Sequence, residues 1–520
     1  MALCLAGLWL AAATACSTDR PENVTLRVLA SSELADMGPV LDDLRRETGI
    51  RLEIDYRGTV DASNALASGK YRHDLAWLSS DRYLRLKQKE TAPGAEPPLA
   101  TGIMRSPVVI GMRPALAAQL RRGANDGRIS WADAADAAAD GTLKFAMADP
   151  RRSNSGLAAL VGVATAAAGT GSPLRPQDVS CDRLRGFFAG HELTADSSDR
   201  LAGDFVRQQD ELGALITYES ELLSLNASGR LRRPLEIVYP DDGMVLSDYP
   251  VLLLDPAERD AYDRMVDWLR SETVQKRIME RTRRRPIDPA VPRSAGLREP
   301  LGNALYFPAD QEVVDRLLAD YGDPERNSPA RVIFLLDFSR SMRGERIAQL
   351  RDAFGGLSGA DDSRSGKFVR FHRGETLTVM RFGGRVLDER SVTYEGQRDL
   401  DRLRSFVASD DFAGSTAIWS ALDHAYGEVA SLVREKRGQD VSIVLMTDGE
   451  NNAGMDLDAF VRKHGALPRE AREVRTYTVR YGEADTRELD RAARATGGRM
   501  VDATAQSLLS AFKEIRGCVQ

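Results

Sequence analysis

Three apolar runs constrain the last third of this chain most strongly: Val332–Leu336, Val441–Met446 and the pair Thr478-Val479. Strands that read as near-continuous apolar runs belong to parallel sheets covered by helices on both faces. Apolar residues with helical spacing occur between and after the runs, as such a sheet requires. They form three sets: Ile347, Leu350 and Phe354; Leu400, Leu403 and Phe406; and Leu508, Phe512 and Ile515. The pattern predicts an α/β fold, a doubly wound sheet, over residues 328–520.

Oxygen-bearing residues follow these runs where the predicted strands end. Asp337, Ser339 and Ser341 follow the first run, Thr416 lies in a later loop, and Asp448 follows the second run. Ligands of open α/β sheets collect beyond the carboxyl ends of the strands, so we expect these loops to meet. Two carboxylates and three hydroxyls suit Mg²⁺, or Mn²⁺ or Ca²⁺ in its place, because these ions prefer oxygen ligands. The sequence predicts a metal site that leaves one coordination position for a partner.

Helix capping is the alternative interpretation of the two serines. A Ser after a strand often accepts hydrogen bonds from the free N–H groups of the next helix, and Ser339 and Ser341 taken singly fit that role. Their combination with Thr416 and Asp448, each at a strand's carboxyl end, favours the metal site.

The motif DxSxS (Asp337, Ser339, Ser341), together with Thr416 and the Asp448 of a TDG segment, resembles the von Willebrand factor type A domain and its metal-ion-dependent adhesion site. The likeness runs from about residue 328 to residue 520. It implies cation-dependent binding of a protein that offers an Asp or Glu carboxylate, without catalysis.

The first three hundred residues alternate between predicted strands and helices. Residues 24–113 contain four strand-like segments, the last of them SPVVIGMRP, which favours a parallel sheet under helices. A second block at about 115–230 has strands and Ala-rich helices of its own, and the chain then returns to the first block. This order predicts one two-lobed domain over 24–295 with a hinged cleft. Residues 296–327, rich in Pro, Gly, Asn and Asp, are expected to be a linker.

Several phrases in this region, among them Gly58-Thr59, Ser79-Ser80, DPRRSNSG and YPDDG, are similar to the type 2 periplasmic solute-binding proteins, in particular those that bind small oxyanions. Free N–H groups at helix N-termini suit an anion, so cleft candidates are hydroxyl residues at strand-to-helix junctions. Helix capping remains the simpler interpretation of each, and Tyr218, where the family places a ligand-facing Tyr, fits core packing equally well. Glu219 and Asp242 are expected to repel an anion, which counts against a simple oxyanion. The candidates are Ser31, Ser32, Thr59, Ser79, Ser106, Ser153, Ser155 and Tyr218.

The start of the chain is expected to be an export signal. Residues 2–15 are apolar but too short to span a bilayer, and Ala13-Thr14-Ala15-Cys16 resembles a bacterial lipoprotein box. The resemblance implies a signal peptide over 1–16, a lipidated Cys16 and a protein anchored at the outer face of the cell membrane. An ordinary cleaved signal is the alternative. Cys181 and Cys518 are then left as a pair, either a disulfide, as an oxidising compartment permits, or two free buried thiols.

Charge and motifs exclude two classes of function. The net charge of −6 and the absence of long basic runs argue against nucleic acid, and the short cluster Arg281–Arg285 fits a solvated helix end. GxSxG, P-loop and HExxH motifs are absent, so we expect no enzyme. The sequence therefore predicts a cell-surface lipoprotein that binds a protein partner through Mg²⁺, with the solute-binding-like domain as spacer or sensor. The alternative is a solute-capture component of an ATP-driven transporter, in which the adhesion domain organises assembly.

Overall fold

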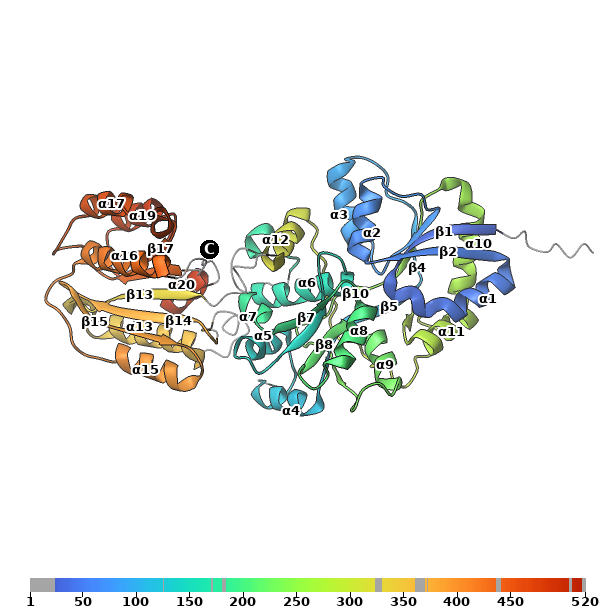
Figure 1. Ribbon diagram of the computed structural model, residues 1–520, viewed down its shortest axis with the longest axis horizontal. Coiled ribbons are helices and arrows are strands. Elements are labelled where there is room, and N and C mark those ends of the chain that lie inside the picture. Colours follow the sequence, from blue (N-terminus) through green and yellow to red (C-terminus); the bar gives the residue numbers. More distant parts are fainter. Residues whose placement is uncertain are drawn as a thin grey trace, which may run out of the picture.

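The computed structural model describes residues 24–124, 126–169, 172–179, 184–322, 330–360, 370–371, 373–435, 441–504 and 507–516. The expected signal peptide with Cys16 and the expected pair Cys181 and Cys518 lie outside the described residues. Three sheets, each with its own helices, follow one another along the long axis of the molecule (Figure 1). The first two sheets form the two lobes of the N-terminal unit, and the third forms a separate C-terminal unit. No helix in the described ranges is long and apolar enough to cross a membrane.

Lobe 1 is built on a five-stranded sheet in the order β2-β1-β3-β11-β4. The neighbours of β1 run parallel to it, as the strand–helix alternation predicted, whereas β11 is antiparallel to β3 and β4. β11 comes from the segment that returns after lobe 2. The strands are β1 (Val24–Ser31), β2 (Ile50–Arg57), β3 (Leu75–Trp77), β4 (Ala100–Gly102) and β11 (Pro250–Leu253); the helices are η1 (Ser32–Met37), α1 (Gly38–Thr48), α2 (Thr59–Ala67), α3 (Arg82–Thr91), α10 (Arg259–Arg270) and α11 (Glu272–Thr282).

Lobe 2 has a sheet in the order β10-β5-β8-β6-β7, with β9 and β12 also paired to β5. Strand β5 was predicted as the fourth strand of the first block, and that placement is wrong: eight of its nine residues are buried, and it pairs with β8, β9, β10 and β12 of the second sheet. The strands are β5 (Met104–Met112), β6 (Phe145–Ala148), β7 (His191–Ala195), β8 (Ala214–Tyr218), β9 (Glu236–Val238), β10 (Leu246–Ser247) and β12 (Arg285–Pro286). Its main helices are α4 (Pro114–Gly123), α5 (Trp131–Ala139), α6 (Asn154–Ala168), α8 (Ser198–Arg207) and α9 (Glu219–Ala227).

The segment expected to be a linker contains a helix, α12 (Gln311–Gly322). Its Val313, Val314 and Leu317 are fully buried in the core of lobe 2, in the same cluster as Tyr83 of lobe 1. Lys87 on α3 of lobe 1 also pairs with Asp315 at 3.4 Å. Helix α12 therefore packs against both lobes just before the chain enters the C-terminal unit.

The C-terminal unit is the predicted doubly wound sheet, in the order β15-β14-β13-β16-β17-β18. All neighbours are parallel except the edge pair β14 and β15, a hairpin that the apolar runs did not reveal. Apolar cores lie on both faces of this sheet. The strands are β13 (Arg331–Asp337), β14 (Thr376–Phe382), β15 (Val386–Thr393), β16 (Val441–Thr447), β17 (Arg475–Arg480) and β18 (Met500–Asp502); the main helices are α13 (Glu345–Gly355), α15 (Gln397–Val407), α16 (Ile418–Glu435), α17 (Leu457–Gly465), α19 (Thr486–Ala495) and α20 (Leu508–Arg516).

Candidate functional site

Strands β13 and β16 bring the two predicted carboxylates to one edge of the C-terminal sheet. The strands are parallel neighbours with Leu336 opposite Met446, so both strands end at the same edge of the sheet. Asp337 is the last residue of β13, and Asp448 directly follows β16. Both carboxylates are buried. The strand register alone therefore accounts for the approach of two acids 111 residues apart in the sequence.

Hydrogen bonds link four of the five predicted metal residues. The Asp337 carboxylate accepts from the Ser339 backbone N–H at 2.7 Å and from the Thr447 hydroxyl at 2.6 Å. The Ser339 and Ser341 hydroxyl oxygens lie 2.9 Å apart, and Ser341 donates to Asp448 at 2.9 Å. A continuous row of oxygens thus runs from the first loop to the third.

The fifth residue, Thr416, is held beside this row through its backbone. Its N–H donates to the Asn452 side-chain oxygen at 2.8 Å, and its carbonyl accepts from the Asn452 N–H at 3.0 Å. In the same loop, Ala413 donates to the Phe338 carbonyl at 2.9 Å. The loop that carries Thr416 is therefore fastened to both other loops of the site, and Asn452 connects it to the Asp448 segment.

Burial makes the ionised forms of the two carboxylates unfavourable when no cation is bound. It raises the pKa of Asp337 to about 6, an effect to which the neighbouring Asp448 contributes, while the Thr447 and Ser339 hydroxyls oppose it. The Arg346 guanidinium on α13 donates to the other Asp448 oxygen at 2.6 Å. A buried carboxylate needs a compensating charge, and Arg346 supplies one for Asp448. Sequence reasoning missed Arg346 because no spacing rule links it to the DxSxS motif.

The donor set fits a hard divalent cation. It contains two carboxylates and three hydroxyls, all oxygen, which is the chemistry that Mg²⁺ takes. Within the described ranges no group of three or more His, Cys, Asp or Glu side chains could hold a metal ion, so this candidate site depends on its hydroxyl oxygens as well as on its two carboxylates. Asp337, Ser339, Ser341, Thr416 and Asp448 are the residues that would hold the ion.

The cleft candidates of the N-terminal unit are buried and bonded to one another. Ser31 and Thr59 hydroxyls lie 2.5 Å apart, Thr59 and Ser79 lie 2.7 Å apart, and Tyr218 of lobe 2 donates to Ser79 of lobe 1 at 3.0 Å. Asn154 extends this network by donating to Tyr218 at 3.0 Å. The lobes are therefore closed on one another here, and hydroxyls expected to bind an anion bond to protein groups.

The other candidates lie outside this chain of bonds. Ser153 and Ser155 hydroxyls pair at 3.0 Å at the start of α6, and Ser106 bonds to Ser220 at 3.2 Å and caps α9 through the Ser220 N–H at 3.1 Å. Ser32 opens η1 and is half-buried.

The N-terminus of α2, one of the helix starts expected to suit an anion, is bonded to the other lobe. The Val60 and Asp61 N–H groups donate to the Arg152 carbonyl at 3.0 and 3.4 Å. A Cβ on Gly58 would lie 2.3 Å from that same carbonyl oxygen, so this approach requires glycine. The Arg152 side chain adds an ion pair with Asp61 at 2.9 Å. The N–H groups that were expected to bind a solute thus donate to the Arg152 carbonyl of the protein itself.

Two interpretations of charged residues near the cleft are wrong. Part of the cluster Arg281–Arg285 is not solvated: Arg284 is fully buried and pairs with Asp36, and buried Arg285 donates to Glu219 through two nitrogens at 2.7 Å. Because Arg285 neutralises Glu219, that carboxylate does not repel an anion as a free charge would. Asp242 accepts from the Trp131 N–H at 2.9 Å and caps α5.

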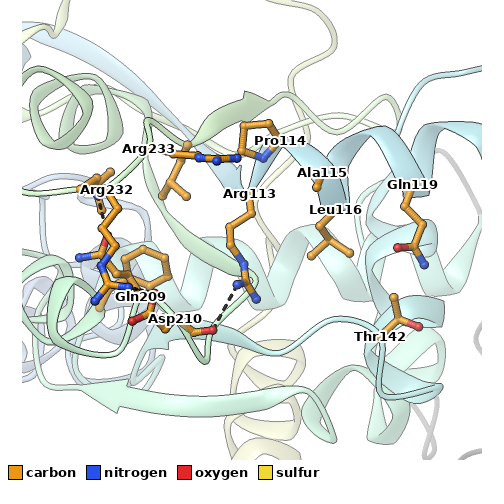
Figure 2. A pocket seen from close by; sticks show the side chains of 13 residues that line it. Arg113, Pro114, Ala115, Leu116, Gln119, Thr142, Gln209, Asp210, Arg232 and Arg233 are labelled. Carbon is orange, nitrogen blue, oxygen red and sulfur yellow. Dashed lines mark hydrogen bonds and ion pairs between the residues drawn. The ribbon is translucent and has the colours of Figure 1, made fainter.

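A pocket of about 500 Å³ opens on lobe 2, away from all predicted site residues. Figure 2 shows Arg113, Arg232 and Arg233 around it, with Arg113 donating to the Asp210 carbonyl at 3.2 Å. Arg232 pairs with the Asp210 carboxylate at 2.6 Å. The Asp210 carboxylate therefore balances the charge of Arg232, whereas the Arg113 guanidinium is bonded to an uncharged backbone carbonyl.

Comparisons with known proteins agree with the two units. Residues 26–281 match the family model described as bacterial extracellular solute-binding protein, and residues 332–514 match the von Willebrand factor type A domain. No curated protein matches the chain at a significant level.

The solved structures that are similar to the chain include periplasmic binding proteins. AfuA from Actinobacillus pleuropneumoniae is 14% identical with a TM-score of 0.44, and the match covers 58% of this chain and 98% of that one. Iron-bound HitA from Pseudomonas aeruginosa is 16% identical with a TM-score of 0.42, covering 58% and 100%. A ferric binding protein from Campylobacter jejuni is 13% identical with a TM-score of 0.41, covering 57% and 96%.

Proposed function

Because this chain joins a bacterial solute-binding domain to a von Willebrand factor type A domain, we propose that it is an exported binding protein whose C-terminal unit captures a protein partner through Mg²⁺. In this proposal the partner's Asp or Glu carboxylate completes the coordination of the ion, and the protein performs no catalysis. The N-terminal unit serves as a spacer or sensor, and lipid on Cys16 holds the chain at the outer face of the cell membrane.

The observation that carries the proposal is the oxygen row at the edge of the C-terminal sheet. Ser341 connects to Ser339 and to Asp448 at 2.9 Å each, so the first and third loops already meet. The ion, when bound, supplies concentrated positive charge to which an incoming carboxylate binds directly. The chain's own part is to bury and orient Asp337 and Asp448, and to hold Thr416 beside them through Asn452.

Closure of the N-terminal unit supports its role as a spacer. Backbone groups of lobe 1 bond to Arg152 of lobe 2, and α12 packs against both lobes immediately before the C-terminal unit. Contacts continue into that unit, where Arg370 pairs with Asp136 of α5 at 2.8 Å. In this proposal the N-terminal unit holds the C-terminal site away from the membrane surface.

The test is capture of envelope proteins by the purified full chain, with Mg²⁺ and with EDTA. The proposal expects one set of partners that is retained with Mg²⁺ and lost with EDTA or in Asp337→Ala. Asp352→Asn is the matched control, because it removes a carboxylate from the exposed face of α13 without touching the site. Partner binding that persists equally in EDTA and in Asp337→Ala would contradict the proposal.

A further inference from the structure

The pocket on lobe 2 is lined by an excess of positive charge. Its volume of about 500 Å³ lies in the range of small-molecule sites in proteins. Of the 13 lining residues, three are arginines and one is acidic, a net charge of +2, whereas the whole chain carries −6. In Figure 2, Arg232 and Arg233 lie on one side of Arg113, and Gln119 and Thr142 lie on the other. Every lining residue belongs to lobe 2, and none takes part in the hydroxyl network between the lobes or in the metal site.

The three arginines of the pocket differ in how their charge is met. Arg232 pairs with the Asp210 carboxylate at 2.6 Å, which uses the acid of the lining. Arg113 donates to the Asp210 backbone carbonyl at 3.2 Å, a bond that leaves its charge without a counter-charge. In the described part of the chain, no hydrogen bond or ion pair engages the Arg233 side chain. Arg113 and Arg233 are therefore the two groups with charge available to a ligand.

Hydrogen bonds fix the segments that carry these arginines. Just beyond the end of α8, the Gln209 side chain donates to the Val206 carbonyl at 2.8 Å and accepts from the Arg232 N–H at 2.8 Å. The Arg113 N–H donates to the Gly213 carbonyl at 3.0 Å, directly before α4 begins. Both segments are thus fastened to the chain around the end of α8. A ligand would meet charges that the fold has already brought together, which lowers the entropic cost of binding.

The rest of the lining is largely apolar. Phe205 and Leu235 belong to the core of lobe 2 and line the pocket from that side. Leu116 and Leu231 are half-buried in its wall. An inorganic anion would use only the arginines, whereas a ligand with a carbon body would also remove this apolar surface from water. The lining therefore favours an anion with an apolar part.

The chemistry of arginine indicates the charged group of the ligand. A guanidinium group binds the oxygens of carboxylates and phosphates through paired, charge-assisted hydrogen bonds. We propose that this pocket binds a small organic anion, whose carboxylate or phosphate is bound by Arg113 and Arg233 and whose apolar part contacts Leu116 and Leu231. The site is separate from the metal site and goes beyond the function proposed above.

The test is ligand-observed NMR titration of phenylacetate and phenyl phosphate with the full chain in EDTA. At least one of the two is expected to bind saturably, and the tighter of them identifies the acid group. Two reference compounds separate the contributions: 2-phenylethanol lacks the charge, and inorganic phosphate lacks the apolar body. Each is expected to bind about tenfold more weakly than the matching probe.

Substitution of the two available arginines locates the binding. Arg233→Gln and Arg113→Gln are each expected to weaken probe binding about fivefold, as for a partly exposed ion pair. Because the Arg233 side chain has no partner within the described chain, Arg233→Gln should melt as the wild type does. Arg122→Gln is the matched control, since Arg122 is an exposed arginine of α4 outside the pocket lining.

Three outcomes would overturn the proposal: no saturable binding of either probe, a reference compound that binds as tightly as its probe, or equal probe affinity in the wild type and both arginine variants. Since EDTA removes the metal site from the measurement, failure here leaves Mg²⁺-dependent partner capture untouched, and failure of partner capture leaves anion binding untouched.

Discussion

Arg346 and Asp448 form an ion pair at the centre of the candidate metal site, with the guanidinium nitrogen 2.6 Å from a carboxylate oxygen. The Asp448 side chain is fully buried, whereas that of Arg346 is 35% exposed. Arg346 therefore acts as a counter-charge for a carboxylate that would also be a ligand of a bound metal ion.

Replacing Arg346 with Met is expected to strengthen Mg²⁺ binding about three- to tenfold, because the ion no longer competes with a partly exposed ion pair worth about 1 kcal/mol. Isothermal titration calorimetry of the purified chain measures this change. Arg340→Met is the control, since it removes an equal charge from the exposed turn that precedes α13. Equal or weaker Mg²⁺ binding by Arg346→Met would show that Arg346 supports the site and does not compete with the ion.

Mg²⁺ binding is expected to weaken as the pH falls through about 6, the pKa of Asp337 in the folded protein. That pKa lies above the ordinary aspartate value of 3.8, so the metal-free fold holds this proton more tightly than the unfolded chain does. The contribution of Asp337 to metal-free stability is therefore complete below about pH 4 and lost as the pH rises through about 6. Melting curves with and without Mg²⁺ at several pH values check this, because the difference isolates the site. A stabilisation by Mg²⁺ that is equal at pH 5 and 8 (about one unit below and two above that pKa) argues against Asp337 as a ligand.

Gly58→Ala is expected to destabilise the closed N-terminal unit by about 1–3 kcal/mol, because the new Cβ would lie 2.3 Å from the Arg152 carbonyl oxygen. That carbonyl is backbone and cannot move aside without breaking its bonds to α2. Chemical denaturation of the full chain measures the effect. Gly38→Ala, with nothing within 4 Å of its added Cβ, is the control. If both variants unfold at the same denaturant concentration, the close approach of the lobes is not a feature of the protein in solution.

Arg285→Met is expected to lower the free energy of unfolding by about 3–5 kcal/mol, because it leaves the buried Glu219 carboxylate without its partner. The double variant Arg285→Met with Glu219→Leu should recover a large part of that loss, since neither charge is then left alone. Denaturation of both variants provides the comparison. A double variant no more stable than Arg285→Met alone would mean that packing, and not charge pairing, accounts for the effect.

The sequence predicted the doubly wound sheet of the C-terminal unit, apart from the β14–β15 hairpin, and the approach of four of the five candidate metal residues. Apolar runs identify parallel strands, and parallel strands force Asp337 and Asp448 to one edge of the sheet. The sequence could not reveal the role of Arg346, because that role depends on the direction in which the Arg346 side chain leaves α13. Strand β5 was assigned to the wrong sheet because a buried run indicates a strand but not its neighbours.

Charged residues near the lobe boundary were the hardest to interpret from the sequence. A cluster such as Arg281–Arg285 reads as a solvated helix end unless its acidic partners are known, and Asp36 and Glu219 are more than sixty residues away in the sequence. Similarly, residues 296–327 have the composition of a linker, so the sequence did not predict α12. The apolar face of α12 is buried against the core of lobe 2, and this contact cannot be read from the composition of the segment.

The most direct measurement of the central claim is calorimetric titration of Mg²⁺ into the metal-free full chain and into Asp337→Ala and Asp448→Ala. The account predicts one bound ion per wild-type chain and no detectable binding by either variant, with Asp352→Asn behaving as wild type. A wild-type chain that binds no Mg²⁺, or variants that bind it as well as the wild type does, would contradict a metal-dependent contact at this edge of the sheet.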